Sequence, residues 1–225
     1  MIKTLRTIFK QDKEKFCIPR SVQQVIPIQA VWADGVFQVG RNKFTRTYKF
    51  MDINYAVASR EDQEAMFLEY SELLNSFDSG ATTKITINNR RLNRQDFEKA
   101  ILIPMREDGL DVYREEYNEM LLEKATGSNR MVQEKYVTVS VYKKTVEEAR
   151  SYFARVGTDL MGHFARLGSK CVELDATERL RALHDFYRAG EETAFFFDLQ
   201  QAMKKGHSFK DFICPDSFEF ERDHF

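Results

Sequence analysis

Three arginines in the run 88–94 are the side chains best suited to holding phosphate groups. Arg90, Arg91 and Arg94 stand among asparagines, directly after a strand predicted over 82–89. Guanidinium and amide groups commonly donate hydrogen bonds to phosphate oxygens, so the cluster is a candidate surface for a polyanion or a partner protein. The alternative is a solvated loop, or arginines paired with acids of the helices that follow. We favour this alternative.

The sequence carries no motif typical of an enzyme or a metal site. The run 167–170, Leu-Gly-Ser-Lys, ends like a phosphate-binding loop, but it lacks the upstream glycine. It also lies between a predicted helix and a strand, whereas such a loop leads from a strand into a helix. Neither the histidines nor the cysteines have the spacing of metal ligands (His163, His184, His207, His224; Cys17, Cys171, Cys214). We therefore predict a chain that is not an enzyme and that binds no cofactor or metal.

A second group of basic residues lies at the N-terminus. Lys3, Arg6 and Lys10 accompany apolar residues at helical spacing (Ile2, Leu5, Ile8, Phe9). A short basic amphipathic helix can lie on an anionic membrane surface, so these cations are candidate membrane contacts. The alternatives are a helix packed on its own domain or on a partner, or a frayed end.

The composition is that of a soluble globular protein. Of the 225 residues, 43% are hydrophobic and 31% are charged, and the formal net charge is -1. Without a large net charge, any binding to nucleic acid or acidic lipid must come from a local patch. Widely separated cysteines and the lack of a signal peptide or of an uncharged run of about 18 residues favour a cytoplasmic location.

The elements that position these residues are clearest between 135 and 175. Residues 136–142 alternate valines with Tyr, Thr and Ser, which predicts a strand with one buried face. The run 145–148 has the pattern of a capping box, and apolar residues at steps of three and four follow it to Leu167. Gly168 is suited to end this helix, and 171–174 is predicted as a second strand. The segment is therefore predicted as a strand–helix–strand unit.

A second unit of the same kind precedes it. It consists of a strand from Phe44 to about Ile53, a helix that begins near Ser59 and ends near 78–80, and the strand over 82–89. Two such units in tandem give the βαββαβ pattern of a ferredoxin-like fold. Between them we predict an insertion at 93–127, with a short helix near 96–102 and a longer one around 110–122.

The remaining segments complete an α+β domain organisation. Residues 1–24 are predicted as an N-terminal helix or arm. Residues 25–175 contain a β-meander, with a hairpin at Asp34-Gly35, and the ferredoxin-like core. Residues 176–225 are predicted as C-terminal helices, opened by a capping box at 175–178, and as a linker towards a domain that this chain lacks.

A further hypothesis concerns aromatic residues of the two strands predicted to be central. Tyr48 and Phe50 lie on one, and Tyr136 and Tyr142 on the other. RNA-recognition domains of ferredoxin-like fold stack bases on such side chains, which makes a single-stranded nucleic-acid binder the alternative function. The third core strand lacks the glycine–aromatic signature of that module, so this interpretation is the weaker one.

The chain resembles the N-terminal region of the conjugation ATPases of conjugative transposons in Gram-positive bacteria, which are TraE/TraC-like type IV secretion motors. The resemblance extends over about the whole chain and is carried by four runs (2–10, 18–28, 75–92 and 168–180). In that family the ATPase domain with its phosphate-binding loop lies further downstream. Because this chain lacks that part, the catalytic residues of the family have no counterparts here.

The resemblance implies a non-catalytic docking and assembly module of a larger motor. Members of the family act at the cytoplasmic face of the membrane in DNA transfer. The implied partners are membrane-channel subunits of the secretion machine and neighbouring copies of the ATPase. An anionic membrane surface and DNA are further candidate partners. The implied location is cytoplasmic and peripheral to the membrane.

Overall fold

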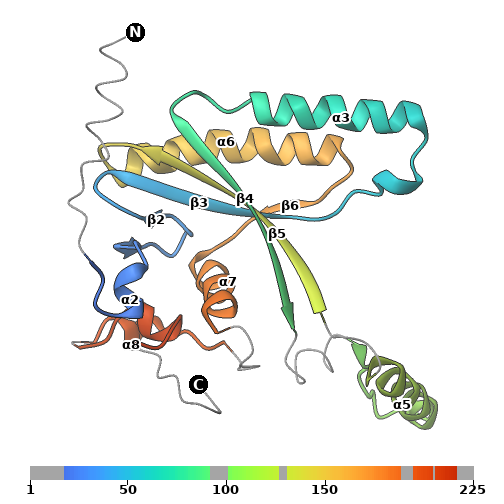
Figure 1. The fold of residues 1–225 in the computed structure, drawn as a ribbon. Coiled ribbons are helices and arrows are strands. Elements are labelled where there is room, and N and C mark those ends of the chain that lie inside the picture. Colours follow the sequence, from blue (N-terminus) through green and yellow to red (C-terminus); the bar gives the residue numbers. More distant parts are fainter. Residues whose placement is uncertain (1–17, 92–100, 127–130, 189–194, 205, 217–225) are drawn as a thin grey trace. The chain divides into compact units, whose positions relative to one another are not determined.

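The computed structural model describes residues 18–91, 101–126, 131–188, 195–204 and 206–216 (Figure 1). The backbone contacts divide the chain into two compact units, one of residues 27–214 and one of residues 1–26 and 215–225. In the described part of the smaller unit, a single turn forms α2 (Val22–Val25), and the Val22 N–H donates to the Asp216 carbonyl at 2.9 Å. The predicted α+β class is confirmed.

The larger unit is built on an antiparallel sheet with the strand order β1-β2-β3-β5-β4. The strands are β1 (Ala30–Val31), β2 (Phe37–Gln38), β3 (Lys43–Phe50), β4 (Ala81–Arg91), β5 (Met131–Tyr142) and β6 (Cys171–Glu173). Along one edge of β3, β2 pairs with its first half and β6 with its last three residues. Along the other edge, β5 pairs with β3 over its full length. The strands β3 and β5 are thus the central pair, as the sequence predicts.

Helices connect and cover these strands. They are α3 (Arg60–Asn75), α5 (Asp111–Thr126), α6 (Val146–Arg166), α7 (Ala176–Tyr187) and α8 (Leu199–Ala202), with short 3-10 turns η1 (Tyr55–Val57) and η2 (Phe209–Phe212). Helix α5 confirms the longer helix predicted around 110–122. Most of the short helix predicted near 96–102 lies outside the described residues. Strand β1 is short, because 22–25 is helical and Pro27 has no N–H to donate.

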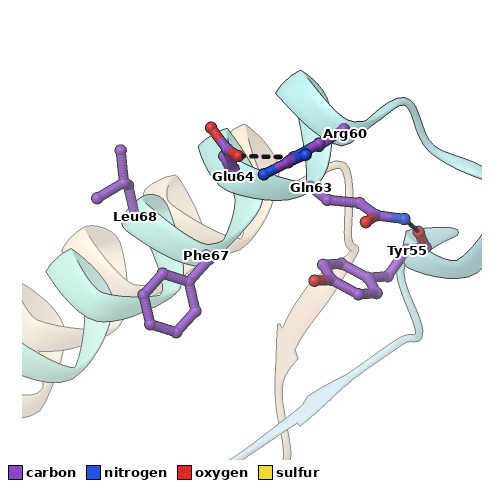
Figure 2. Close-up of a pocket in the computed structure, with 6 residues that line it drawn as sticks. All are labelled: Tyr55, Arg60, Gln63, Glu64, Phe67 and Leu68. Atoms are coloured by element: carbon purple, nitrogen blue, oxygen red, sulfur yellow. Dashed lines mark hydrogen bonds and ion pairs between the residues drawn. The ribbon is translucent and has the colours of Figure 1, made fainter.

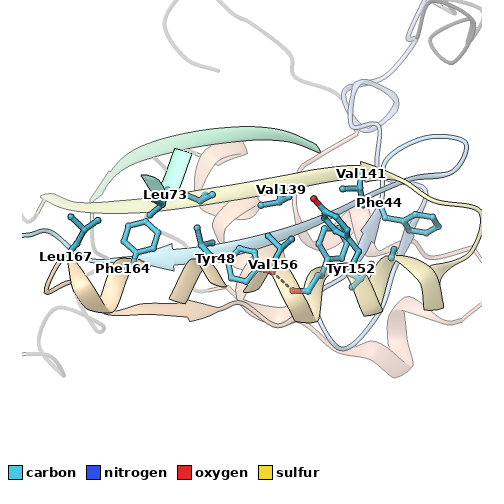
Figure 3. Packing of buried hydrophobic residues seen from close by; sticks show 14 residues of the cluster. Phe44, Tyr48, Leu73, Val139, Val141, Tyr152, Val156, Phe164 and Leu167 are labelled. Carbon is cyan, nitrogen blue, oxygen red and sulfur yellow. Dashed lines mark hydrogen bonds between the residues drawn. The ribbon is translucent and has the colours of Figure 1, made fainter. Parts of the chain in front are cut away.

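The main core lies between the sheet and α6, with α3 beside α6 on the same face (Figures 1 and 3). The buried residues of α6 recur at helical spacing (Ala149, Phe153, Val156, Leu160, Phe164). They pack on the alternating valines of β5, Val137, Val139 and Val141, which are also buried. Complete burial of one such side chain contributes roughly 1.5–3 kcal/mol, so this layer dominates the stability of the unit.

The helix termini follow the predicted signals in most details. Thr145 caps α6 by accepting from the Glu148 N–H at 3.3 Å, but the Glu148 carboxylate accepts from Lys144 instead of closing the box. Asp175 and Glu178 form the complete capping box of α7. Gly168 follows α6 with φ 74°, the left-handed conformation expected of a residue that ends a helix.

Helix α7 is attached to the opposite face of the sheet by one buried arginine. The side chain of Thr45 points away from α6, because residues along β3 alternate between the two faces. Arg179 donates from Nη1 to the carbonyls of Gly35 and Thr45, at 2.6 and 2.9 Å, and from Nη2 to Thr45 Oγ1 at 3.0 Å. Its guanidinium also lies 3.8 Å from the centre of the Phe37 ring. These contacts join α7 to the β1–β2 turn and to β3.

Candidate interaction surface

Two of the three arginines in the predicted cluster lie within a strand and not directly after it. Strand β4 extends through Arg90 and Arg91, which pair with Val132 and Met131 of β5. The strand therefore ends two residues later than predicted, because backbone pairing continues where the apolar alternation has ended. Arg94 lies outside the described residues, and so do the N-terminal cations Lys3, Arg6 and Lys10.

Of the four aromatic residues of the central strands, Tyr48 and Tyr136 are buried, whereas Phe50 and Tyr142 are half-buried. Tyr48 is completely buried and donates its hydroxyl to the Phe153 carbonyl of α6 at 3.2 Å. Burial raises the pKa of Tyr48, which keeps this hydroxyl a donor. Phe50 stacks on Phe164, with ring centres 4.8 Å apart. Both side chains lie on the face of the sheet that α6 covers, which argues against base stacking on this strand.

Tyr136, on the second central strand, is buried on the other face of the sheet. It is 7% exposed, and its hydroxyl donates to Glu134 Oε2 at 2.7 Å. Lys49 Nζ donates to the other oxygen of the same carboxylate at 2.7 Å. These residues line a polar groove of about 210 Å³ beside α7. Since the Glu134 carboxylate is satisfied by these two neighbours, the groove has the character of a structural polar network.

Helix α3 exposes much more apolar surface than its position beside α6 requires. Phe67 and Leu68 are 65% and 64% exposed, and Tyr70 and Leu74 are 38% and 43% exposed. Within α3, only Leu73 is buried. The sequence predicts one apolar stripe on this helix. The structure divides it into an inner edge that packs on the core and an outer edge that faces solvent. Tyr55 of η1, also exposed, extends the outer edge. We call these five exposed side chains the α3 surface.

An open groove of about 450 Å³ lies at the first turns of α3 (Figure 2). The rings of Tyr55 and Phe67 line it together with Leu68. Gln63 Nε2 donates to the carbonyls of Tyr55 and Ala58, at 3.0 and 3.2 Å. These bonds tie η1 to α3, and so the groove is held in place by backbone contacts on both sides.

Helix α3, which forms one side of the groove, is acidic, and Glu64 is the acidic residue that lines the groove. Apart from Arg60, every charged residue of α3 is acidic (Glu61, Asp62, Glu64, Glu69, Glu72). Arg60 is paired with Glu64 at 3.3 Å. Contiguous exposed apolar side chains with a polar rim typically mark protein–protein interaction sites. The excess of carboxylates indicates a partner that presents basic residues around an apolar centre.

One group of potential metal ligands lies where α3 meets α6. Oxygen and nitrogen atoms of Glu69, Glu72 and His163 approach within 4.8 Å of one another. However, Arg166 Nε donates to Glu69 Oε1 at 2.7 Å, and His163 Nδ1 contacts the same oxygen at 2.7 Å. A guanidinium at this carboxylate repels a cation. We therefore interpret the group as an ion-pair cluster that joins the two helices.

Phe67, Tyr70 and Leu74 lie at helical spacing in the sequence, but this spacing alone does not show that they are exposed. One signal was available. Leu68 follows Phe67 directly, which makes the apolar arc wider than a single buried face of a helix. An apolar arc of that width is typical of a helix with contacts on two sides.

Comparisons with known proteins identify no family. The sequence matches no protein-family model and no curated protein. Within the part of the chain that the structure describes, no helix has both the length and the apolar composition needed to cross a bilayer.

Proposed function

We propose that this chain is a non-catalytic docking and assembly module of a conjugative type IV secretion ATPase. In this proposal the α3 surface binds a membrane-channel subunit at the cytoplasmic face of the membrane. The observation that carries it is the exposure of Phe67, Leu68, Tyr70 and Leu74 on a helix whose inner edge is already packed. The resemblance described above supplies the kind of machine and the kind of partner.

We also propose that the core is ferredoxin-like. The order β4-β5-β3-β6 supports this, since β3 and β5 are central. The connections through α3, from β3 to β4, and through α6, from β5 to β6, follow the βαββαβ pattern. In this arrangement the edge helix α3 is an exposed element that is able to contact partners without disturbing the sheet.

Binding at the α3 surface depends mainly on the apolar side chains. Aromatic residues that become fully buried in an interface contribute about 2 kcal/mol or more when truncated, which is roughly a thirtyfold change in affinity. Phe67 meets this description, as it is large, accessible and next to the groove. The carboxylates around it contribute orientation and association rate, because charges at a rim act mostly through steering.

The test uses a matched pair of exposed phenylalanines in the full-length protein of the conjugative element. Phe67→Ser removes the centre of the α3 surface. Phe186→Ser changes a side chain of α7 with nearly the same exposure, 63% against 65%. We expect Phe67→Ser to reduce conjugation and co-purification with channel subunits at least tenfold, and Phe186→Ser to leave both unchanged. Equal behaviour of the two variants at normal protein levels would contradict the proposal.

The alternative function, binding of single-stranded nucleic acid, makes a different prediction. It depends mainly on Arg90, Arg91 and Arg94, because Tyr48 and Tyr136 of the sheet are buried. Affinity for a single-stranded oligonucleotide that falls steeply with salt, and that is lost on replacing the three arginines by alanine, would support it. In the docking proposal, this triple replacement leaves co-purification with channel subunits intact.

A further inference from the structure

The outer edge of β4 is a long strand edge that no bulge or proline interrupts, and its charged residues are Lys84, Arg90 and Arg91. Strand β4 is the last in the sheet order, and it pairs with β5 at every residue from Ala81 to Arg91. In the described part of the chain, no other strand pairs with it. The edge strands of natural proteins are typically short, bulged, interrupted by proline or protected by charged side chains. The register of β4 on β5 is continuous from end to end, and its sequence contains no proline.

The side chains of β4 include exposed residues of types that are common in strands paired on both edges. Ile85 and Ile87 are 45% and 58% exposed, and they lie on the same face because alternate residues of a strand do so. Their neighbours Thr83 and Thr86 are β-branched, a type enriched in paired strands. The edge therefore offers backbone hydrogen-bonding groups and an apolar pair at the same place.

We propose that β4 pairs antiparallel with β4 of a second copy of this chain, about a two-fold axis at Thr86. In this register Ile85 of each copy lies opposite Ile87 of the other, so four isoleucines meet on one face. Lys84 lies opposite Asn88, and Thr83 lies opposite Asn89. Directly opposed side chains in an antiparallel pair are close neighbours, and opposed like charges are destabilising. This register avoids them.

The neighbouring symmetric registers are less favourable. An axis at Ile87 places Lys84 opposite Arg90 and leaves Ile85 opposite Asn89. An axis at Ile85 keeps one isoleucine contact and places Ile87 opposite Thr83. A two-fold axis perpendicular to the sheet also keeps the helix layers of both copies on one side of a continuous sheet. The interface is isologous, as in most homodimers.

This inference deepens the proposed function, because it assigns a surface to the self-association of ATPase copies, and its biological meaning rests on that function. The predicted β4 dimer does not depend on the side chains of the α3 surface. Failure of the dimer and failure of docking at α3 can therefore be told apart.

The test measures the oligomeric state of the complete 225-residue chain by sedimentation and light scattering over a range of concentrations. We expect a concentration-dependent dimer. Ile85→Lys/Ile87→Lys should abolish it, because the introduced cations would lie opposite one another. The control Val57→Lys/Val112→Lys adds the same charge at two exposed valines away from β4 and should still dimerise.

Two further measurements test the register. Ile85→Glu/Ile87→Glu should also be monomeric alone, whereas an equimolar mixture with the lysine variant should form a heterodimer. A disulfide should link Thr86→Cys to its copy, because the axis places position 86 opposite itself. Thr82→Cys should not cross-link, since eight residues of strand separate the two copies of position 82 by about 26 Å.

Three results would overturn the inference. They are a monomer at every concentration, a dimer that the lysine variant retains, and a failure of the oppositely charged variants to combine. If the chain is a monomer and Phe67→Ser still reduces conjugation, the β4 interface is wrong and docking at α3 stands. If the dimer forms as expected and Phe67→Ser has no effect on conjugation, docking at α3 is wrong and the β4 interface stands.

Discussion

Arg179 is the residue whose replacement tests most directly how α7 is held on the sheet. Its side chain is buried, and it binds the carbonyl of Gly35, the carbonyl and hydroxyl of Thr45, and the ring of Phe37. Burial lowers the pKa of Arg179, since taking the charge out of water disfavours the protonated form. The contacts to oxygen atoms and to the aromatic ring oppose this cost.

The expected effect of Arg179→Met follows from these contacts. Methionine retains much of the apolar stem but removes a donor from the Gly35 and Thr45 oxygens, at a cost of about 1–3 kcal/mol for each buried acceptor left without a partner. Loss of the cation–π contact adds roughly 0.5–2 kcal/mol. The methionine variant no longer buries a charge, and this offsets part of the lost stability. We expect a net destabilisation of about 3 kcal/mol, and about half of that for Arg179→Lys, which keeps a donor.

Chemical and thermal unfolding measure this difference. For a chain of this size, 3 kcal/mol lowers Tm by roughly 6–12 °C. Thr177→Met, at an exposed position of the same helix, is the control and should change stability by less than about 0.5 kcal/mol. If Arg179→Met were as stable as the parent, the cost of burying the charge would equal the gain from its contacts. Arg179 would then make no net contribution to holding α7 on the sheet, and this would refute the role proposed for it.

Three other replacements test single contacts. Gly35→Ala should destabilise by about 3 kcal/mol or more in urea titrations, because its φ is 81° and an added Cβ would lie 2.0 Å from the Leu174 carbonyl oxygen. Tyr48→Phe should cost about 1 kcal/mol in the same assay, for one buried hydrogen bond. The hydrogen bond with His163 holds the pKa of Glu69 below its usual value. Ionised Glu69 therefore stabilises the fold above the pKa it has when unfolded, and this contribution is lost as pH falls through the folded pKa. Glu69→Gln should lower Tm near neutral pH but not in acid, and an equal loss at both would contradict this assignment.

The strand–helix–strand unit from β5 to β6 could be predicted from sequence because burial imposes a period on the residues. The three valines of β5 and the apolar stripe of α6 each face the same core, so their spacing records the secondary structure. The capping box at 175–178 and Gly168 mark the helix ends through local backbone chemistry. All these signals arise within a few residues of one another.

Other features could not be predicted, since their causes are distant in the sequence or lie in the backbone. Arg179 appears in the sequence as one more charged residue of a helix, and its main acceptors are backbone carbonyls that leave no trace in residue types. Strand β4 continues through Arg91 by backbone pairing, although its side chains no longer alternate. The apolar pattern of α3 shows that its apolar arc is wide, but it does not show that Phe67 lies on the part of this arc that no other element covers.

The α3 surface and the β4 edge differ in the kind of partner they fit, and this difference connects the two proposals. Apolar side chains among carboxylates cannot be self-complementary, because two copies of α3 brought together would oppose like charges. The β4 edge is self-complementary, since its lysine and isoleucines find suitable partners in its own sequence when it is reversed. A module with both surfaces is able to join copies of itself through the sheet and to bind a basic, apolar partner at α3. Assembly and docking would then use different side chains, so Phe67→Ser should leave the dimer unchanged.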